Sequence, residues 1–539
     1  MSSLYPLHSA NSAGQTSGEK VQEAQDWQRK LTLAQAEAQR GHFDGFLRVC
    51  RGIVDAHAGQ ADVLLQVGSL LLSFGFLTAA RRCFERVRVL APSDLRPLVN
   101  LANIAQQAGD HVQSRQLYAL LLSHLPDHPV IRRNALLSLE YDPDVPDEER
   151  LAQAKAWGAW AVANAGGMRE RPAMPPLDGR PLRVGYVSAD FCQHTVGLFV
   201  KDVIASHNRS RMQVFTYSAG QVDDWVTATV RQASTFRDIR NLDDAAVAEQ
   251  IRQDGIDVLV DLSGHTAGSR LTVFAYRPAP VQVSWLGYFA TTGLPVMDAV
   301  LLDDWHAPSG MEAQFVERIV RLDGGRFCYA PVPFAPEDVA PAPCPVNGHV
   351  TFGSFNNTAK LNPAVIALWA RVLAAVPESR LLLKWRTFQD EEMRAQISGA
   401  FARHGIAADR IVLRGASFHV DVLKEYADID ICLDTFPFTG GLTSCEALWM
   451  GVPVVTWPQG RVVSRQSYAF LKAIGLEELA AESADDYVRI AAELAGNPDR
   501  IRTLRSAMRS QMRQSALCDV AGFTQRIEEA IRRLALEVA

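Results

Sequence analysis

The first third of the chain carries a period of 34 residues, and this period narrows the possible folds more than any other pattern. Glycines, an aromatic residue and residues near the expected helix ends all repeat at this spacing: Gly41, Gly75 and Gly109; Phe84 and Tyr118; Ala58, Pro92 and Pro126. A fixed period of this size indicates a stacked repeat, in which no unit buries its apolar face alone. We therefore predict a row of helical hairpins.

The spacing is typical of tetratricopeptide repeats. Each hairpin is expected to carry its glycine where two helices approach closely and its proline after the second helix. Two repeats are well formed, and the unit around Gly41 is degenerate. An ordinary helical bundle with coincidentally spaced glycines is the alternative. We place the repeats at residues 25–165, behind a leader at residues 1–24 that is rich in Ser, Gly, Gln and Asn and predicted to be flexible.

Short apolar segments alternate with helical stretches from Leu182 onward. The first set is LRVGYVS, VFTYS, IDVLVDLSG, VQVSWLGY and DAVLLDD; after a proline-rich stretch, the second is HVTFGSF, RLLLKW, RIVLRG, IDICLDT and PVVTW. This alternation predicts parallel sheets covered by helices. We expect two Rossmann-like lobes, at residues 180–335 and 346–518, and a closing C-terminal helix at residues 519–539. The ligand cleft should lie between the carboxyl ends of the strands.

Composition excludes several classes of partner. The chain has 54 basic and 60 acidic residues, and its net charge of −6 is too mild for a nucleic-acid footprint. No apolar run approaches the roughly 20 residues of a membrane span, and the first residues lack a signal-peptide pattern. The eight cysteines are scattered without zinc-type spacing, as expected of reduced thiols. We expect a cytoplasmic protein that binds neither nucleic acid nor membrane.

The most informative segment is IDICLDTFPFTGGLTSCEALWMGVPVVTWP, residues 429–458. A predicted strand ends at Asp434, and a glycine turn then leads into a helix. The turn and the first helical positions are Gly440, Gly441, Leu442 and Thr443. Free backbone N–H groups at a helix N-terminus bind phosphate groups, and Glu446, one turn into the helix, is placed to accept both hydroxyls of a ribose. A plain strand-turn-helix connection is the alternative.

Further candidate site residues follow four other predicted strands. Lys360 lies in FGSFNNTAKLNP, His194 lies in LRVGYVSADFCQHTVGLFV, and His265 and Gly287 lie in VDLSGHTAGSRLTVFAYRPAPVQVSWLGY. The carboxyl ends of parallel strands meet at one edge of a sheet, so these residues are expected at the cleft. A lone lysine is more often a solvated surface charge, and only its surroundings argue otherwise.

These four segments resemble the protein O-linked N-acetylglucosamine transferases and their bacterial relatives. The run LDTFPFTGGLTSCEALWMGVPVVT looks like the nucleotide-binding motif of that family, and the resemblance spans roughly residues 142–515. It implies a bacterial homologue with a GT-B-like α/β fold, preceded by the all-α tetratricopeptide-repeat region. The implied activity is inverting transfer of N-acetylglucosamine from UDP-GlcNAc to Ser or Thr hydroxyls of polypeptides.

The resemblance also implies how the donor is held. Lys360, with Asn357 beside it, is expected to contact the diphosphate, where a cation offsets the charge that builds on the departing nucleotide. The backbone of residues 440–443 is expected to bind the same diphosphate, Glu446 the ribose and His419 the uracil. UDP-GlcNAc is then a co-substrate and no cofactor is implied, since GT-B enzymes generally need no divalent metal.

On the acceptor side, His194 is the first candidate for the base. A pKa near 6.5 suits a histidine for accepting the proton of the attacking hydroxyl or for holding the sugar; capping the following helix is the alternative. A phosphate oxygen of the donor is the other possible proton acceptor. His265 and the loop at Gly287 are expected to line the sugar and acceptor side, although a histidine at position 265 serves equally well to fix a loop.

The chain departs from animal members of the family at four positions. Gln, Cys, His and Asp of those members are replaced here by Asn357, Phe438, Gly441 and Glu446. Asn and Glu keep the chemistry, whereas the histidine is lost. Two alternatives stay open: a glycosyltransferase with a non-protein acceptor, and a repeat-scaffold interaction protein with degenerate transferase lobes. The repeats are expected to guide a polypeptide acceptor.

Overall fold

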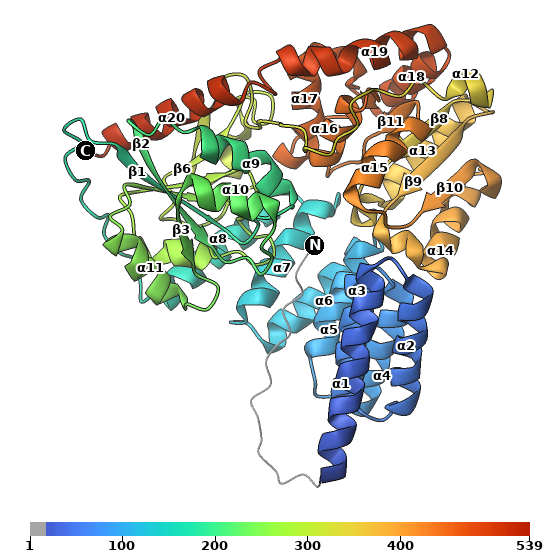
Figure 1. The fold of residues 1–539 in the computed structure, drawn as a ribbon, viewed down its shortest axis with the longest axis horizontal. Helices are drawn as coiled ribbons and strands as arrows, with labels where there is room; N and C mark the ends of the chain where they lie inside the picture. Colours follow the sequence, from blue (N-terminus) through green and yellow to red (C-terminus); the bar gives the residue numbers. More distant parts are fainter. Residues whose placement is uncertain (1–17) are drawn as a thin grey trace.

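The computed structural model describes residues 18–539, and its first part is a row of helical hairpins (Figure 1). The helices are α1 (Gly18–Gln39), α2 (Phe43–Ala56), α3 (Ala61–Ser73), α4 (Leu77–Leu90), α5 (Arg96–Gln107), α6 (His111–His124), α7 (Pro129–Tyr141) and α8 (Asp147–Asn164). Residues 1–17 of the predicted leader lie outside the described residues. The remainder of that leader is helical, because Glu, Lys and Gln after Gly18 favour a helix.

The repeat glycines serve the turns between helices. Gly41, Gly75 and Gly109 have φ angles of 81°, 89° and 78°, a left-handed conformation that glycine adopts without steric cost. The prediction that they lie at close helix approaches is therefore wrong. That approach occurs at Gly68, where a Cβ would lie 2.8 Å from the ring of Phe84. The repeat prolines follow the ends of α4 and α6, as predicted.

The N-terminal lobe contains a parallel sheet in the order β3-β2-β1-β4-β5-β6-β7. Its strands are β1 (Leu182–Ser188), β2 (Met212–Ser218), β3 (Thr235–Asp238), β4 (Val258–Asp261), β5 (Val281–Trp285), β6 (Ala299–Leu302) and β7 (Arg318–Arg321). Their helices are α9 (Thr195–Ser206), α10 (Trp225–Ala233) and α11 (Asp244–Gln253). The strand order reverses between β1 and β4, the switch point of a doubly wound sheet.

Alternate residues of these strands face two different cores. Val258 and Val260 belong to the apolar cluster that includes α9, whereas Leu259 belongs to the cluster that includes α11 and Trp157 of α8. The last helix of the repeat region is thus part of the core of the N-terminal lobe.

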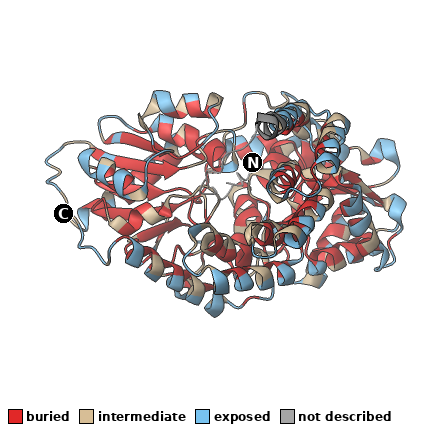
Figure 2. Ribbon diagram, turned by 90° about the horizontal axis from the view of Figure 1, so that it is seen from below, coloured by how far each residue is buried: buried red, intermediate tan, exposed pale blue. Residues whose placement is uncertain are grey.

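The C-terminal lobe contains a second parallel sheet, in the order β10-β9-β8-β11-β12. Its strands are β8 (Thr351–Ser354), β9 (Arg380–Lys384), β10 (Ile411–Arg414), β11 (Ile431–Leu433) and β12 (Val454–Val455). The main helices are α13 (Pro363–Ala375), α14 (Glu391–Ala402), α15 (His419–Glu425), α16 (Leu442–Trp449), α17 (Gln466–Ile474), α18 (Ala484–Ala495) and α19 (Pro498–Gln514). The central strands of both lobes are buried (Figure 2), and the second switch point lies between β8 and β11.

The last helix, α20 (Val520–Leu536), crosses back from the C-terminal lobe to the N-terminal lobe (Figure 1). Phe523 of α20 stacks on Trp285 with ring centroids 5.9 Å apart. Two doubly wound lobes behind an all-α repeat region form the predicted GT-B-like arrangement. Among the helices of residues 18–539, none combines the length and the apolar character that a membrane crossing requires.

The repeats are fixed to both lobes. A Cβ at Gly158 of α8 would lie 1.9 Å from the carbonyl oxygen of Gly293 in the N-terminal lobe. In the C-terminal lobe, the Thr358 hydroxyl donates to the carbonyl of Gln107 at 2.8 Å. A Cβ at Gly109 would lie 2.7 Å from another carbonyl of that lobe. The repeat turns therefore contact the loop that carries Lys360.

Candidate active site

The helix α16 presents its N-terminus at the carboxyl edge of the second sheet. The carboxylate of Asp434, just after β11, accepts the backbone N–H of Gly440 at 2.7 Å and the Thr456 hydroxyl at 2.7 Å, and so fixes the preceding turn. A Cβ at Gly440 would lie 2.1 Å from Ser444 Oγ, so a side chain there would displace the Ser444 hydroxyl. No side chain caps α16, and its first two residues are partly exposed. The terminus offers backbone donors and partial positive charge to an anion.

Lys360 brings a buried cation to the same place. It ends the short helix η3 (Thr358–Lys360), after the strand that pairs with β11. Its Nζ donates to Asn356 Oδ1 at 2.9 Å and to the carbonyl of Thr439 at 2.8 Å. Asn356 Oδ1 also accepts the hydroxyl of Thr443, in the first turn of α16, at 3.3 Å. Desolvation lowers the pKa of Lys360 to about 8. The ammonium and the helix terminus thus lie together at the β8/β11 switch point.

Asn357, predicted to lie at the diphosphate, caps the short helix that carries Lys360, and its contact with the diphosphate stays a prediction. Its Oδ1 accepts the backbone N–H of Ala359 at 3.0 Å and caps η3. The preceding residue, Asn356, makes the contacts with Lys360. Sequence reasoning missed Asn356; its only signal was the Asn-Asn pair, and neighbouring side chains in an extended segment point in different directions.

Glu446 and His419 meet at the cleft. Glu446 Oε1 lies 2.5 Å from His419 Nε2, and His419 Nδ1 lies 3.1 Å from the side-chain nitrogen of Gln193 in the N-terminal lobe. Because Gln193 donates to Nδ1, the ring proton is assigned to Nε2, which donates to Glu446. Glu446 is buried and His419 is 21% exposed. The contact joins the predicted ribose and base residues to the loop that carries His194.

His194 caps α9. Its Nδ1 accepts the backbone N–H of Val196 at 3.4 Å and lies 3.6 Å from Asp190 Oδ1. Desolvation lowers the pKa of His194, so the ring is neutral near pH 7. An accepting Nδ1 places the proton of the neutral ring on Nε2. The capping alternative is therefore observed, while the side chain remains 32% exposed; a role in the reaction stays a prediction.

His265 lies inside the N-terminal lobe and not on the cleft surface. It is 0% exposed, its Nε2 donates to the Thr292 carbonyl at 2.9 Å, and its ring packs edge-on against Trp157 and Tyr288. Desolvation lowers its pKa to about 4. This is the loop-fixing alternative and corrects the expected sugar contact. Gly287 also has a packing role, because a Cβ there would lie 1.8 Å from a backbone carbonyl next to β4.

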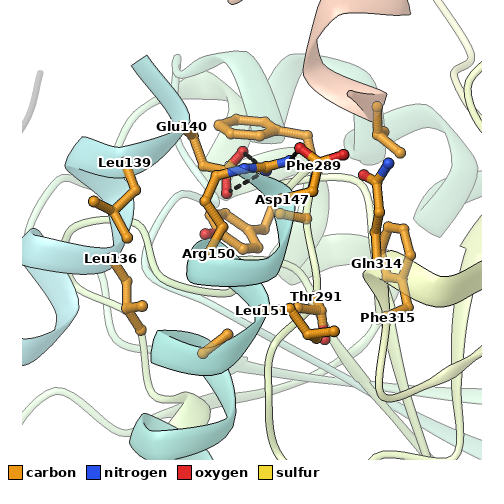
Figure 3. Close-up of a pocket in the computed structure, with 14 residues that line it drawn as sticks. Leu136, Leu139, Glu140, Asp147, Arg150, Leu151, Phe289, Thr291, Gln314 and Phe315 are labelled. Carbon is orange, nitrogen blue, oxygen red and sulfur yellow. Dashed lines mark hydrogen bonds and ion pairs between the residues drawn. The ribbon is translucent and has the colours of Figure 1, made fainter. Parts of the chain in front are cut away.

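A pocket opens where the repeats meet the N-terminal lobe (Figure 3). Helices α7 and α8 and the loop after β5 form its walls, and Arg150 pairs there with Glu140 at 2.7 Å and with Asp147 at 2.6 Å. Phe289, which lines the pocket, also contacts Phe438 of the C-terminal lobe with ring centroids 4.5 Å apart. The repeats and both lobes therefore meet beside the Lys360 site.

Known proteins resemble this chain over most of its length. The profile of Glycosyl transferase family 41 matches residues 171–328 and 345–527. The probable UDP-N-acetylglucosamine–peptide N-acetylglucosaminyltransferase SPINDLY of Solanum lycopersicum is 37% identical over 420 residues, which are 76% of this chain and 44% of that protein. The UDP-N-acetylglucosamine–peptide N-acetylglucosaminyltransferase of Caenorhabditis elegans is 24% identical, over 66% of this chain and 41% of that protein. The chain spans less than half the length of these curated relatives.

A solved structure is similar over both the repeats and the lobes. A mutant of the Thermobaculum terrenum O-GlcNAc transferase superposes with a TM-score of 0.87 at 32% identity. The match covers 97% of this chain and 99% of that chain.

Proposed function

The chain belongs to glycosyl transferase family 41, and from this we propose that it transfers N-acetylglucosamine from UDP-GlcNAc to Ser or Thr hydroxyls of polypeptides, with inversion. The observation that carries the proposal is the buried Lys360 ammonium, which is linked through Asn356 to the uncapped N-terminus of α16. The names of the relatives support the donor and the acceptor. A scaffold with degenerate lobes would have no need of a buried cation at this point.

In the proposed reaction, the bond between the anomeric carbon and the diphosphate breaks while a hydroxyl oxygen bonds to that carbon from the opposite face. Lys360 and the backbone N–H groups at residues 441–443 stabilise the negative charge that develops on UDP. Glu446 accepts the ribose hydroxyls, and His419 lies next to the base. The hydroxyl proton passes to His194 or to a phosphate oxygen of the donor.

We assign the acceptor to the side where the repeats meet the lobes. Helices α7 and α8 form one wall of the pocket in Figure 3, and the repeat turns contact the loop that carries Lys360. A polypeptide bound along the repeats would therefore be led to the reacting centre.

The eight cysteines are free thiols, which supports placement of the protein in the reducing cytoplasm.

The donor is tested by thermal stability with UDP, UDP-GlcNAc, UDP-glucose and GDP-sugars. A ligand at 100 times its Kd adds about 2.7 kcal/mol to the free energy of unfolding. We expect UDP-GlcNAc and UDP to stabilise the protein most. A larger effect of a GDP-sugar would mean that this sugar nucleotide is the donor. Transfer of that sugar to Ser- and Thr-containing peptides would then be measured by mass spectrometry.

Transfer activity should persist in excess EDTA, because Lys360 and the helix terminus supply the positive charge. Complete loss of activity that magnesium restores would contradict a metal-free mechanism.

Glu446→Ala should weaken UDP binding by roughly 1.5 to 3 kcal/mol, the usual contribution of a hydrogen bond to a charged group. Titration calorimetry with UDP measures this change. Glu446→Asp is the matched control, because it keeps a carboxylate that can accept the ribose hydroxyls and should bind UDP more tightly than Glu446→Ala. Unchanged UDP affinity in a folded Glu446→Ala protein would rule out the ribose placement.

A further inference from the structure

An aromatic cluster covers the Lys360 ammonium, and each of its three rings comes from a different part of the molecule. Phe438 belongs to the C-terminal lobe, Phe289 to the N-terminal lobe and Tyr141 to the last repeat helix pair. Ring centroids lie 4.5 Å apart for Tyr141 and Phe438, and 4.5 Å apart for Phe289 and Phe438. The Nζ of Lys360 lies 4.4 Å from the centroid of Phe438.

We propose that Phe438 is a positioning residue for Lys360, and that its ring completes the set of contacts that aims the ammonium and keeps it charged. The proposal deepens the proposed function, on which its consequence for catalysis rests. The direct contact between Phe438 and Lys360 does not depend on the identity of the donor.

The contacts of Lys360 explain why a ring is needed there. Two of its three N–H groups donate to Asn356 Oδ1 and to the Thr439 carbonyl. Nζ also lies over the Phe438 ring, whose face attracts a cation through its electron density. Without that ring, the buried ammonium would lose one of the partners that replace its hydration in water, and its charged form would be less stable.

The charged and titratable groups around Lys360 do not provide the same support. Asp434 is the acidic group that raises its pKa, but this carboxylate already accepts the Gly440 N–H and the Thr456 hydroxyl. Burial raises the pKa of Tyr141 to about 12, so its phenol is neutral from pH 7 to 9. His111, stacked on Tyr141, is neutral in the same range, because desolvation lowers its pKa.

The two flanking rings hold Phe438 in place. Phe289 meets it nearly perpendicularly, with an interplanar angle of 72°, and Tyr141 is tilted by 34°. Edge-to-face and offset arrangements are the favourable geometries for such pairs. The orientation of Phe438 over Lys360 is therefore set jointly by the repeats and the N-terminal lobe.

The experiment compares Phe438→Leu and Phe438→Met, which remove the ring, with Phe438→Tyr, which keeps it. Phe43→Leu is the matched control, because Phe43 pairs with Phe76 in the first repeats, with ring centroids 5.9 Å apart. The chain has eight lysines, so the [ε-13C]lysine NMR spectrum is simple, and the Lys360 signal is assigned by its absence from Lys360→Met. Titration of this signal in the ligand-free protein reads the pKa of Lys360 directly.

We expect the two aliphatic variants to lower the pKa of Lys360 by roughly one pH unit, and Phe438→Tyr and Phe43→Leu to leave it near the wild-type value. The loss of kcat/KM in Phe438→Leu should then grow with pH, from about twofold at pH 7 to about fivefold at pH 8. A merely structural defect would lower activity equally at both pH values.

An unchanged Lys360 pKa in a folded Phe438→Leu or Phe438→Met protein would overturn the inference. Because the titration needs no substrate, it separates this inference from the proposed function. A lowered pKa in a protein that transfers no sugar from any nucleotide donor would support the positioning role and contradict the glycosyltransferase activity.

Discussion

Lys360→Met is expected to lower kcat for sugar transfer by a factor of roughly 10² to 10³, with a smaller loss of UDP affinity. In the proposed reaction, the ammonium meets negative charge that grows on the diphosphate as the bond to the sugar breaks. The bound donor already carries most of that charge, so the variant loses more in the transition state than in the ground state. Steady-state kcat with UDP-GlcNAc and a peptide, together with the calorimetric Kd of UDP, measures both effects.

Lys472→Met is the matched control for this substitution. Lys472 lies on α17, is 30% exposed and pairs with Glu477 at 3.1 Å, so its loss should leave kcat near the wild-type value. Weaker UDP binding with an unchanged kcat in Lys360→Met would mean that the lysine only binds the donor. An unchanged kcat together with an unchanged UDP affinity would remove Lys360 from the reaction.

The pH dependence gives a second measure of the same residue. In the proposed reaction Lys360 acts as a cation, and desolvation lowers its pKa to about 8. Activity that depends on the charged lysine should therefore be retained below this pKa and be lost as the pH rises through it. In Lys360→Arg the side chain stays charged at all accessible pH values, so the remaining activity should lack this alkaline limb.

The apolar segments of the sequence predict all the strands except the two edge strands of the first sheet, and the structure shows why these two were missed. LRVGYVS is β1, Leu182–Ser188, and each of the other predicted segments overlaps a strand. The missed strands, β3 (TFRD) and β7 (RIVR), lie at the two edges of the first sheet and are largely half-exposed. An edge strand needs no continuous apolar run, and so it leaves a weak signal in the sequence.

The site divides in the same way into local and long-range features. The turn before α16 and its uncapped terminus follow from residues adjacent in sequence, namely Asp434, Gly440 and Gly441, and so could be predicted. The contacts of Gln193 with His419 and of Phe438 with Lys360 join residues 226 and 78 positions apart. They depend on how the two lobes and their loops pack, which no local pattern records.

His194→Ala is expected to suppress transfer while it leaves UDP affinity nearly unchanged, because His194 lies on the N-terminal lobe and α16 on the other. If the ring accepts the hydroxyl proton, the loss should be roughly 10² to 10⁴-fold. Transfer rates across pH and calorimetry with UDP separate this case from a role in holding the sugar. A sugar-holding histidine would weaken the binding of UDP-GlcNAc but not of UDP, and would leave the pH profile unshifted.

The observed capping geometry makes the base role depend on Asp190. With Nδ1 accepting the Val196 N–H, the neutral ring carries its proton on Nε2, and that atom can only donate a hydrogen bond. To accept a proton at Nε2, the neutral ring must carry its hydrogen on Nδ1. Asp190 Oδ1, which lies 3.6 Å from Nδ1, would then have to accept a hydrogen bond from that N–H. If His194 is the base, Asp190→Asn should therefore lower the rate of transfer and shift the acidic limb of its pH profile. An unaffected pH profile in Asp190→Asn, combined with a large loss in His194→Ala, would assign His194 to the sugar and the proton to the donor phosphate.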